Sequence, residues 1–156
     1  MRRIWILVAD AGRARILSKI EGIKRLSLVQ AIDNPLGRAR NMDLVTDHPG
    51  RLQKGGSGVM SDMDPRTDPH EQKAIEFAHQ LNKLLYSAAI QGEYGLLAVI
   101  APAHFLGLLR AGMKPATNHR MVLHQANDFT HLTLSELELR LGDVARYHYA
   151  EVAQHG

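Results

Sequence analysis

The chain has 156 residues, 45% of them hydrophobic, which is enough to fill the core of one domain spanning residues 1–156. It contains no cysteine, which excludes disulfides, thiolate metal sites and cysteine nucleophiles and is typical of a reducing compartment. The net charge of +3 is mildly basic and permits contact with a polyanion such as RNA without requiring it.

Residues 4–9 form a wholly apolar run that follows two arginines and ends at Asp10. A secretory signal needs an apolar region of roughly 7–15 residues with a cleavage site, and a membrane-spanning helix needs about 20 apolar residues. The run fits neither pattern, so we expect a cytoplasmic protein with no membrane partner. The run is instead typical of a strand buried on both faces of a sheet and closed by a turn at residues 10–12.

Two further strands are expected before residue 36. Residues 13–19 alternate small or apolar side chains with long polar ones, as a more exposed strand would. A third strand carries Leu26, Leu28 and Val29 and ends near residues 33–35, where turn-forming residues follow. The first third of the chain therefore predicts an antiparallel meander.

Residues 34–67 show no helical or strand periodicity and predict a long, flexible loop. Loops of this length are uncommon in compact domains and are often functional. The loop is locally basic, and four of its basic residues with an adjacent glycine pair form a candidate RNA-binding set: Arg38, Arg40, Arg51, Lys54, Gly55 and Gly56. A solubilising surface is the alternative, because the stretch has no aromatic residue on which a base could stack.

A helix is expected from Asp68 to about Ile90. Asp68 can accept from a first-turn amide, Pro69 suits the first helical position, and Glu71 can bond back to the cap. Apolar residues then recur at helical spacing along one face, which predicts packing against the sheet.

The second half of the chain alternates strands and helices. Residues 96–100 are a second apolar run, which we expect beside the first and parallel to it. A helix from Pro102 to Gly112 and a strand at 121–124 follow. We expect an α/β fold: a mixed five-stranded sheet of order 3-2-1-4-5, as in ribonuclease H-like domains, with helices on both faces.

The last helix is expected to start at Thr133. Thr133 and Glu136 have the spacing of a capping box, and Gly142 can end the helix. Leu134, Leu137 and Leu141 are expected to be buried.

Several segments together resemble the bacterial host-attachment family, which is named for a proposed role in attachment to host cells. They cover nearly the whole chain: residues 5–15, Asp68-Pro69-His70-Glu71, Phe77-Ala78, Ala101-Pro102 with Phe105-Leu106-Gly107 and Leu109-Arg110, and Asn127-Asp128-Phe129-Thr130-His131 before Ser135-Glu136-Leu137. The family looks related to the middle domain of archaeal and eukaryotic peptide-chain release factors and of Pelota. The resemblance therefore implies the same fold and a link to the ribosome.

Two departures limit what the resemblance implies about activity. Release factors carry Gly-Gly-Gln before the long helix, where the glycines let the backbone approach its substrate. Here Gly55 and Gly56 are followed by Ser57, so peptide release is not expected. In the motif at residues 127–131, members of the host-attachment family usually have a lysine at the first position. Asn127 stands there in this chain, which removes any phosphate contact that the lysine would make.

The carboxyl ends of the parallel strands form the other candidate site. They would collect Asp10, His104 and Asp128, with His131 nearby, and open α/β sheets commonly bind ligands at such an edge. Carboxylates at this edge hold Mg²⁺ in ribonuclease H-like nucleases. We favour a structural interpretation, with Asp10 and Asp128 forming turns, because two carboxylates without a third are a poor metal set. No metal or other cofactor is expected.

Three functions remain open at this point. The first is a non-enzymatic accessory protein that associates with RNA or the ribosome through residues 34–67. The second is a metal-dependent nuclease or phosphoesterase that uses Asp10, His104 and Asp128. The third is an indirect role in attachment to host cells. The sequence does not indicate the oligomeric state.

Overall fold

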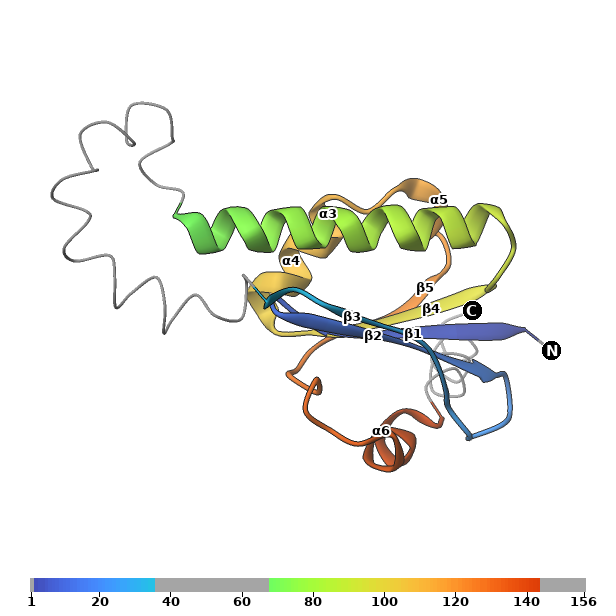
Figure 1. Ribbon diagram of the computed structural model, residues 1–156. Helices are drawn as coiled ribbons and strands as arrows, with labels where there is room; N and C mark the ends of the chain where they lie inside the picture. Colours follow the sequence, from blue (N-terminus) through green and yellow to red (C-terminus); the bar gives the residue numbers. More distant parts are fainter. Residues whose placement is uncertain (1, 36–67, 144–156) are drawn as a thin grey trace, which may run out of the picture.

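Five strands form one mixed sheet with helices on both of its faces (Figure 1). The structure is a computed structural model, and it describes residues 2–35 and 68–143. The strand order is β3-β2-β1-β4-β5, which confirms the fold class and order expected from the sequence. The elements in chain order are β1 (Arg3–Asp10), β2 (Arg13–Ile20), β3 (Ser27–Asp33), α3 (Pro69–Ile90), β4 (Leu96–Ala101), α4 (Ala103–Ala111), α5 (Pro115–Asn118), β5 (Met121–Ala126) and α6 (Leu134–Leu141).

The two apolar runs lie side by side in the middle of the sheet and point the same way. β1 pairs with β4 in parallel, from Ile4 opposite Leu96 to Val8 opposite Ile100. Residues 4–9 and all of β4 are buried. Successive side chains of a strand point to opposite faces, so complete burial requires cover on both faces of the sheet. This pair fixes the centre of the fold.

The second strand is more buried than we expected. β2 pairs with β1 on one side and with β3 on the other, so it is an inner strand. Ser18 and Lys19 are 5% and 4% exposed. Burial lowers the pKa of Lys19, although Asp143 and Glu21 act in the opposite direction. The expectation was wrong because both faces of this inner strand are covered: Ala14 and Ile16 pack in one core cluster and Leu17 in the other.

The third strand lies at an edge of the sheet. β3 pairs with β2 from Asp33, opposite Arg13, to Ser27, opposite Ser18. Leu28 lies on it as expected and is about half exposed, as is Val29. Leu26 instead precedes the strand and is buried, and its amide donates to Glu138 Oε1 of α6 at 2.9 Å.

The helices α3, α4 and α5 cover one face of the sheet (Figure 1). α3 begins as expected: Asp68 caps it and accepts from the Glu71 amide at 2.7 Å. Its buried residues share one core cluster with Trp5, Leu7 and Ala9 of β1. The short helix α5 was not anticipated, and β5 runs two residues beyond the strand expected at 121–124.

The helix α6 covers the opposite face (Figure 1). The capping box of Thr133 and Glu136 is present, as expected. Leu137 and Leu141 are buried in a second cluster with Ile4 and Ile6 of β1. Leu134, which we expected to be buried, is 38% exposed, because it is the first residue of the helix and lies at the rim of this contact.

None of the helices within residues 2–35 and 68–143 combines the length and apolar character needed to cross a bilayer.

Candidate functional site

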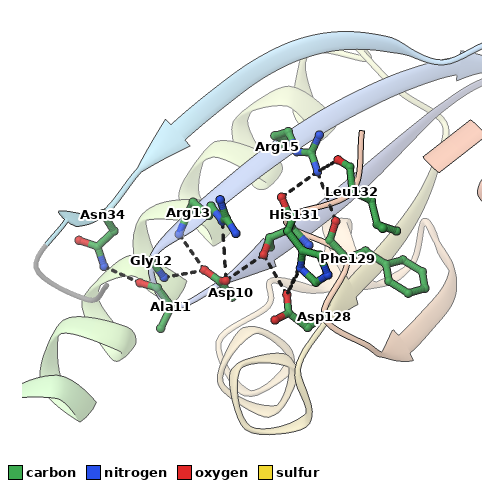
Figure 2. A network of polar contacts seen from close by, with 11 residues as sticks. Asp10, Ala11, Gly12, Arg13, Arg15, Asn34, Asp128, Phe129, His131 and Leu132 are labelled. Atoms are coloured by element: carbon green, nitrogen blue, oxygen red, sulfur yellow. Dashed lines mark hydrogen bonds and ion pairs between the residues drawn. The ribbon is translucent and has the colours of Figure 1, made fainter. Parts of the chain in front are cut away.

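The candidate site lies at the edge of the sheet where β1, β4 and β5 end, which we call the carboxyl edge. The turn after β1 and the loop after β5 face each other there (Figure 2). Parallel strands bring their carboxyl ends to one edge, so residues far apart in the sequence meet at this place.

Asp10 forms the tight turn between β1 and β2. Its Oδ1 accepts hydrogen bonds from the amides of Gly12 at 2.8 Å and Arg13 at 2.9 Å. A short carboxylate that accepts from the backbone two residues ahead is a common way to stabilise a turn. This confirms the structural role that the sequence predicts for Asp10.

A single hydroxyl connects the two candidate carboxylates. Thr130 Oγ1 lies 3.0 Å from Asp10 Oδ2 and 2.8 Å from Asp128 Oδ1, and Thr130 is only 5% exposed. A threonine hydroxyl carries one hydrogen, so the two carboxylates share one donor. We call this arrangement the Asp10–Thr130–Asp128 bridge, and it ties the loop after β5 to the end of β1.

Arg15 provides a second tie between the same loop and the sheet. Its Nη2 donates to the carbonyl oxygens of Phe129, Thr130 and Leu132, at 3.2, 2.9 and 2.7 Å (Figure 2). Burial, and then the nearby Arg13 guanidinium, lowers the pKa of Arg15. No carboxylate among the described residues forms a salt bridge with Arg15, so its partners are neutral.

His131 and His104 take different positions. His131 Nδ1 lies 4.0 Å from Asp128 Oδ1, and the imidazole is largely exposed. His104 Nε2 lies 2.7 and 2.8 Å from the two carboxylate oxygens of Glu71, which joins the first turns of α3 and α4. The expectation that Glu71 bonds back to its helix cap is therefore corrected, because its carboxylate lies against His104.

The structure therefore brings together three of the four residues that we expected at this edge. Asp10 and Asp128 share the Thr130 hydroxyl, and His131 lies beside Asp128. His104 contacts Glu71 instead. Within the part of the chain that the structure describes, no three His, Asp or Glu side chains are placed to hold a metal ion.

The expected RNA-binding set lies in residues 36–67, outside the described residues: Arg38, Arg40, Arg51, Lys54, Gly55 and Gly56.

Sequence reasoning missed Arg13, Arg15 and Thr130. A signal for the arginines was present, because residues 13 and 15 alternate along a strand directly after the Asp10 turn and therefore share a face. Thr130 stands two positions after Asp128, a spacing at which an aspartate side chain can meet it in a turn. Neither signal indicates that the two segments meet.

Three solved structures are similar to the chain at low identity. An archaeal protein matches with a TM-score of 0.44 and 10% identity, over 98% of this chain and 41% of its own. The archaeal translation termination factor aRF1 matches with a TM-score of 0.39 and 12% identity, over 98% and 41%. The Ppx/GppA phosphatase of Aquifex aeolicus matches with a TM-score of 0.38 and 11% identity, over 80% and 35%. The chain thus spans about two fifths of the length of the first two proteins.

No curated protein matches the sequence. A kinship with release factors stays a prediction. The sequence does match, over residues 5–141, a family described as proteins required for attachment to host cells. This match confirms the resemblance carried by the segments between Trp5 and Leu137. The chain therefore belongs to this host-attachment family.

Proposed function

We propose that the protein is a non-enzymatic accessory protein that associates with RNA or the ribosome. The observation that supports this function is a pair of arginines at the carboxyl edge whose charge is poorly neutralised. Arg15 donates only to neutral carbonyls among the described residues. Arg13 forms only a long ion pair, with its Nε 4.0 Å from Asp10 Oδ2, and its side chain is partly exposed. Phosphates of RNA would supply the missing negative charge.

The basic stretch of the sequence is attached to the same edge. The chain leaves the described part of the fold at Pro35, just after Asp33, which pairs with Arg13. It re-enters at Asp68, and α3 starts at the end of the sheet where β1 and β4 finish (Figure 1). Five basic residues stand between these two anchors in the sequence, and the expected RNA-binding set contains four of them: Arg38, Arg40, Arg51 and Lys54. A polyanion that binds at this edge can therefore contact both groups of basic residues.

The test measures binding of purified protein to single-stranded RNA and to ribosomes at several salt concentrations. Loss of four contacts to phosphates makes the slope of log K against log salt less negative by about 3 for single strands. We expect this change for a variant with glutamine at residues 38, 40, 51 and 54. A matched control loses the same charge from exposed positions elsewhere, by glutamine substitution of Arg25, Lys83, Arg110 and Lys114. Equal binding by the two variants, or no binding by the unmodified protein, would refute the proposal.

The same samples separate binding from hydrolysis. If the protein is a metal-dependent nuclease, labelled RNA is cleaved when Mg²⁺ is added, and Asp10→Asn abolishes cleavage while RNA binding remains. We expect intact RNA instead, because the oxygens of Asp10 already accept hydrogen bonds from Gly12, Arg13 and Thr130. Cleavage that depends on Asp10 would replace the proposed function with the enzymatic one.

The family description favours a second function, attachment to host cells. A strain that lacks the protein should then attach less to host cells, and the unmodified chain should restore attachment. Labelling of surface proteins distinguishes a direct role from an indirect one, since only a direct role requires the protein on the cell surface. Normal attachment by the deletion strain would exclude this function.

A further inference from the structure

A hollow of about 340 Å³ lies beside the Asp10–Thr130–Asp128 bridge. Residues 13–15 of β2, residues 31–33 of β3 and Thr130 line it. Ligand sites of small molecules occupy roughly 300–1,000 Å³, so the hollow is large enough for a small ligand only. We call it the arginine hollow, after Arg13 and Arg15.

The strand register explains why a hollow forms here. Arg13 is opposite Asp33, and Arg15 is opposite Ala31. Residues 13 and 15 point to the same face of β2 because side chains alternate along a strand. Arg15 reaches the loop after β5 on the α6 side, whereas Ala31 contributes only a methyl group. The two arginines and Thr130 of the loop thus line the hollow together with the short side chains of Ala14 and Ala31.

The charges that line the hollow favour an anion. Two arginines and one aspartate, Asp33, line the hollow, and Asp10 forms an ion pair with Arg13 at 4.0 Å but does not line it. Arg15 is held in place by three carbonyl oxygens, which fix its position without neutralising its charge. The guanidinium of Arg13 acts on Arg15 as a like charge, and the pKa of Arg15 is lowered by burial and by this repulsion. An anion between the two would relieve the repulsion.

We propose that the arginine hollow binds the phosphate group of a ligand about the size of one nucleotide. Guanidinium groups hold phosphate oxygens in paired, charge-assisted hydrogen bonds, and Arg15 is already positioned for this by its contacts with the loop. The phosphate is either that of a free mononucleotide or that of an RNA chain. Only the RNA source rests on the proposed function.

The test titrates the full chain with inorganic phosphate, adenosine 5′-monophosphate and hexauridylate in chloride buffer. Amide chemical shifts report where each probe binds, and we expect changes at residues 13–15, 31–33 and 130. Arg13→Gln should lower the binding affinity for each of the three probes by about tenfold or more, since one charged donor is lost. Ala31→Leu places a larger side chain in the hollow, opposite Arg15, and keeps both arginines, so it should weaken the binding of adenosine 5′-monophosphate more than that of inorganic phosphate. Arg25→Gln removes an exposed charge elsewhere and should leave all three affinities unchanged.

The outcomes for the hollow and for RNA association are distinguishable. If the mononucleotide binds in the hollow and RNA and ribosomes do not bind, the hollow is a phosphate site and the proposed function fails. If RNA binds but Arg13→Gln and Ala31→Leu leave its affinity unchanged, the function stands and the hollow proposal is overturned. The hollow proposal is also overturned if neither inorganic phosphate nor the mononucleotide binds to the folded protein. Urea midpoints of the variants show whether each one is folded.

Discussion

Replacing Arg15 by methionine should release the loop after β5 from the sheet. The side chain keeps a similar length and apolar stem, whereas its donors to the carbonyls of Phe129, Thr130 and Leu132 are lost. Nη2 carries two hydrogens, so two of the three carbonyls can receive a well-directed bond at one time. The substitution therefore removes about two charge-assisted hydrogen bonds.

The expected loss of stability follows from these bonds. A hydrogen bond to a charged group contributes about 1.5–3 kcal/mol, and water can rehydrate carbonyls in a partly exposed loop. We therefore expect Arg15→Met to lower the free energy of unfolding by about 2–3 kcal/mol. In a domain of this size, this corresponds to a fall in Tm of about 5–10 °C.

Urea unfolding followed by tryptophan fluorescence measures this loss. Trp5 is the single tryptophan, it is 5% exposed, and it stacks on Tyr94 with 4.8 Å between ring centroids. Its emission therefore changes when the core opens. Arg110→Met is the matched control, because Arg110 is exposed near the end of α4, and it should change stability by less than about 0.5 kcal/mol. If Arg15→Met behaves like this control, the loop does not depend on the arginine and the reasoning is refuted.

Three further predictions use the same assay. Thr130→Val removes the hydroxyl that Asp10 and Asp128 share and should cost about 1.5–2 kcal/mol, whereas Thr130→Ser keeps the hydroxyl and should cost less; a smaller loss for Thr130→Val than for Thr130→Ser would show that the methyl group matters and the bridge does not. Leu137→Ala opens a cavity at a fully buried position and should cost about 2–5 kcal/mol, against less than about 0.5 for Leu139→Ala on the exposed face of the same helix. Lys19→Met should stabilise by about 1 kcal/mol, because a buried charge is replaced by an apolar group. Burial lowers the pKa of folded Lys19 below 10.5, so the unmodified protein gains stability as the pH rises towards that value. The stability difference between Lys19→Met and the unmodified protein should therefore shrink over this pH range. A constant difference would contradict the burial of a charged Lys19 as its cause.

The strands and helices could be predicted from local patterns. The apolar runs at residues 4–9 and 96–100 require cover on both faces, so they identify the central pair of the sheet, which β1 and β4 form. Asp68 and Thr133 mark helix starts through their own side chains, and both caps form as expected. Each of these signals involves residues that are close in the sequence. A helix cap is a hydrogen bond within one turn, and an apolar run reflects the burial of consecutive side chains of one strand, so both can be recognised locally.

The burial of β2 and the composition of the site depend on tertiary structure. The alternation of β2 predicts an exposed strand, yet Lys19 is buried, because its neighbour Ile4 lies on the face of the sheet that α6 covers. Arg15 binds carbonyls 114 to 117 positions further along the chain, and Thr130 meets Asp10 across 120 positions. No pattern of spacing reports contacts of this kind, because they exist only after parallel strands bring their carboxyl ends to one edge. The apolar strands and the turns that follow them are enough to locate this edge, whereas the side chains that meet there are brought together by tertiary packing.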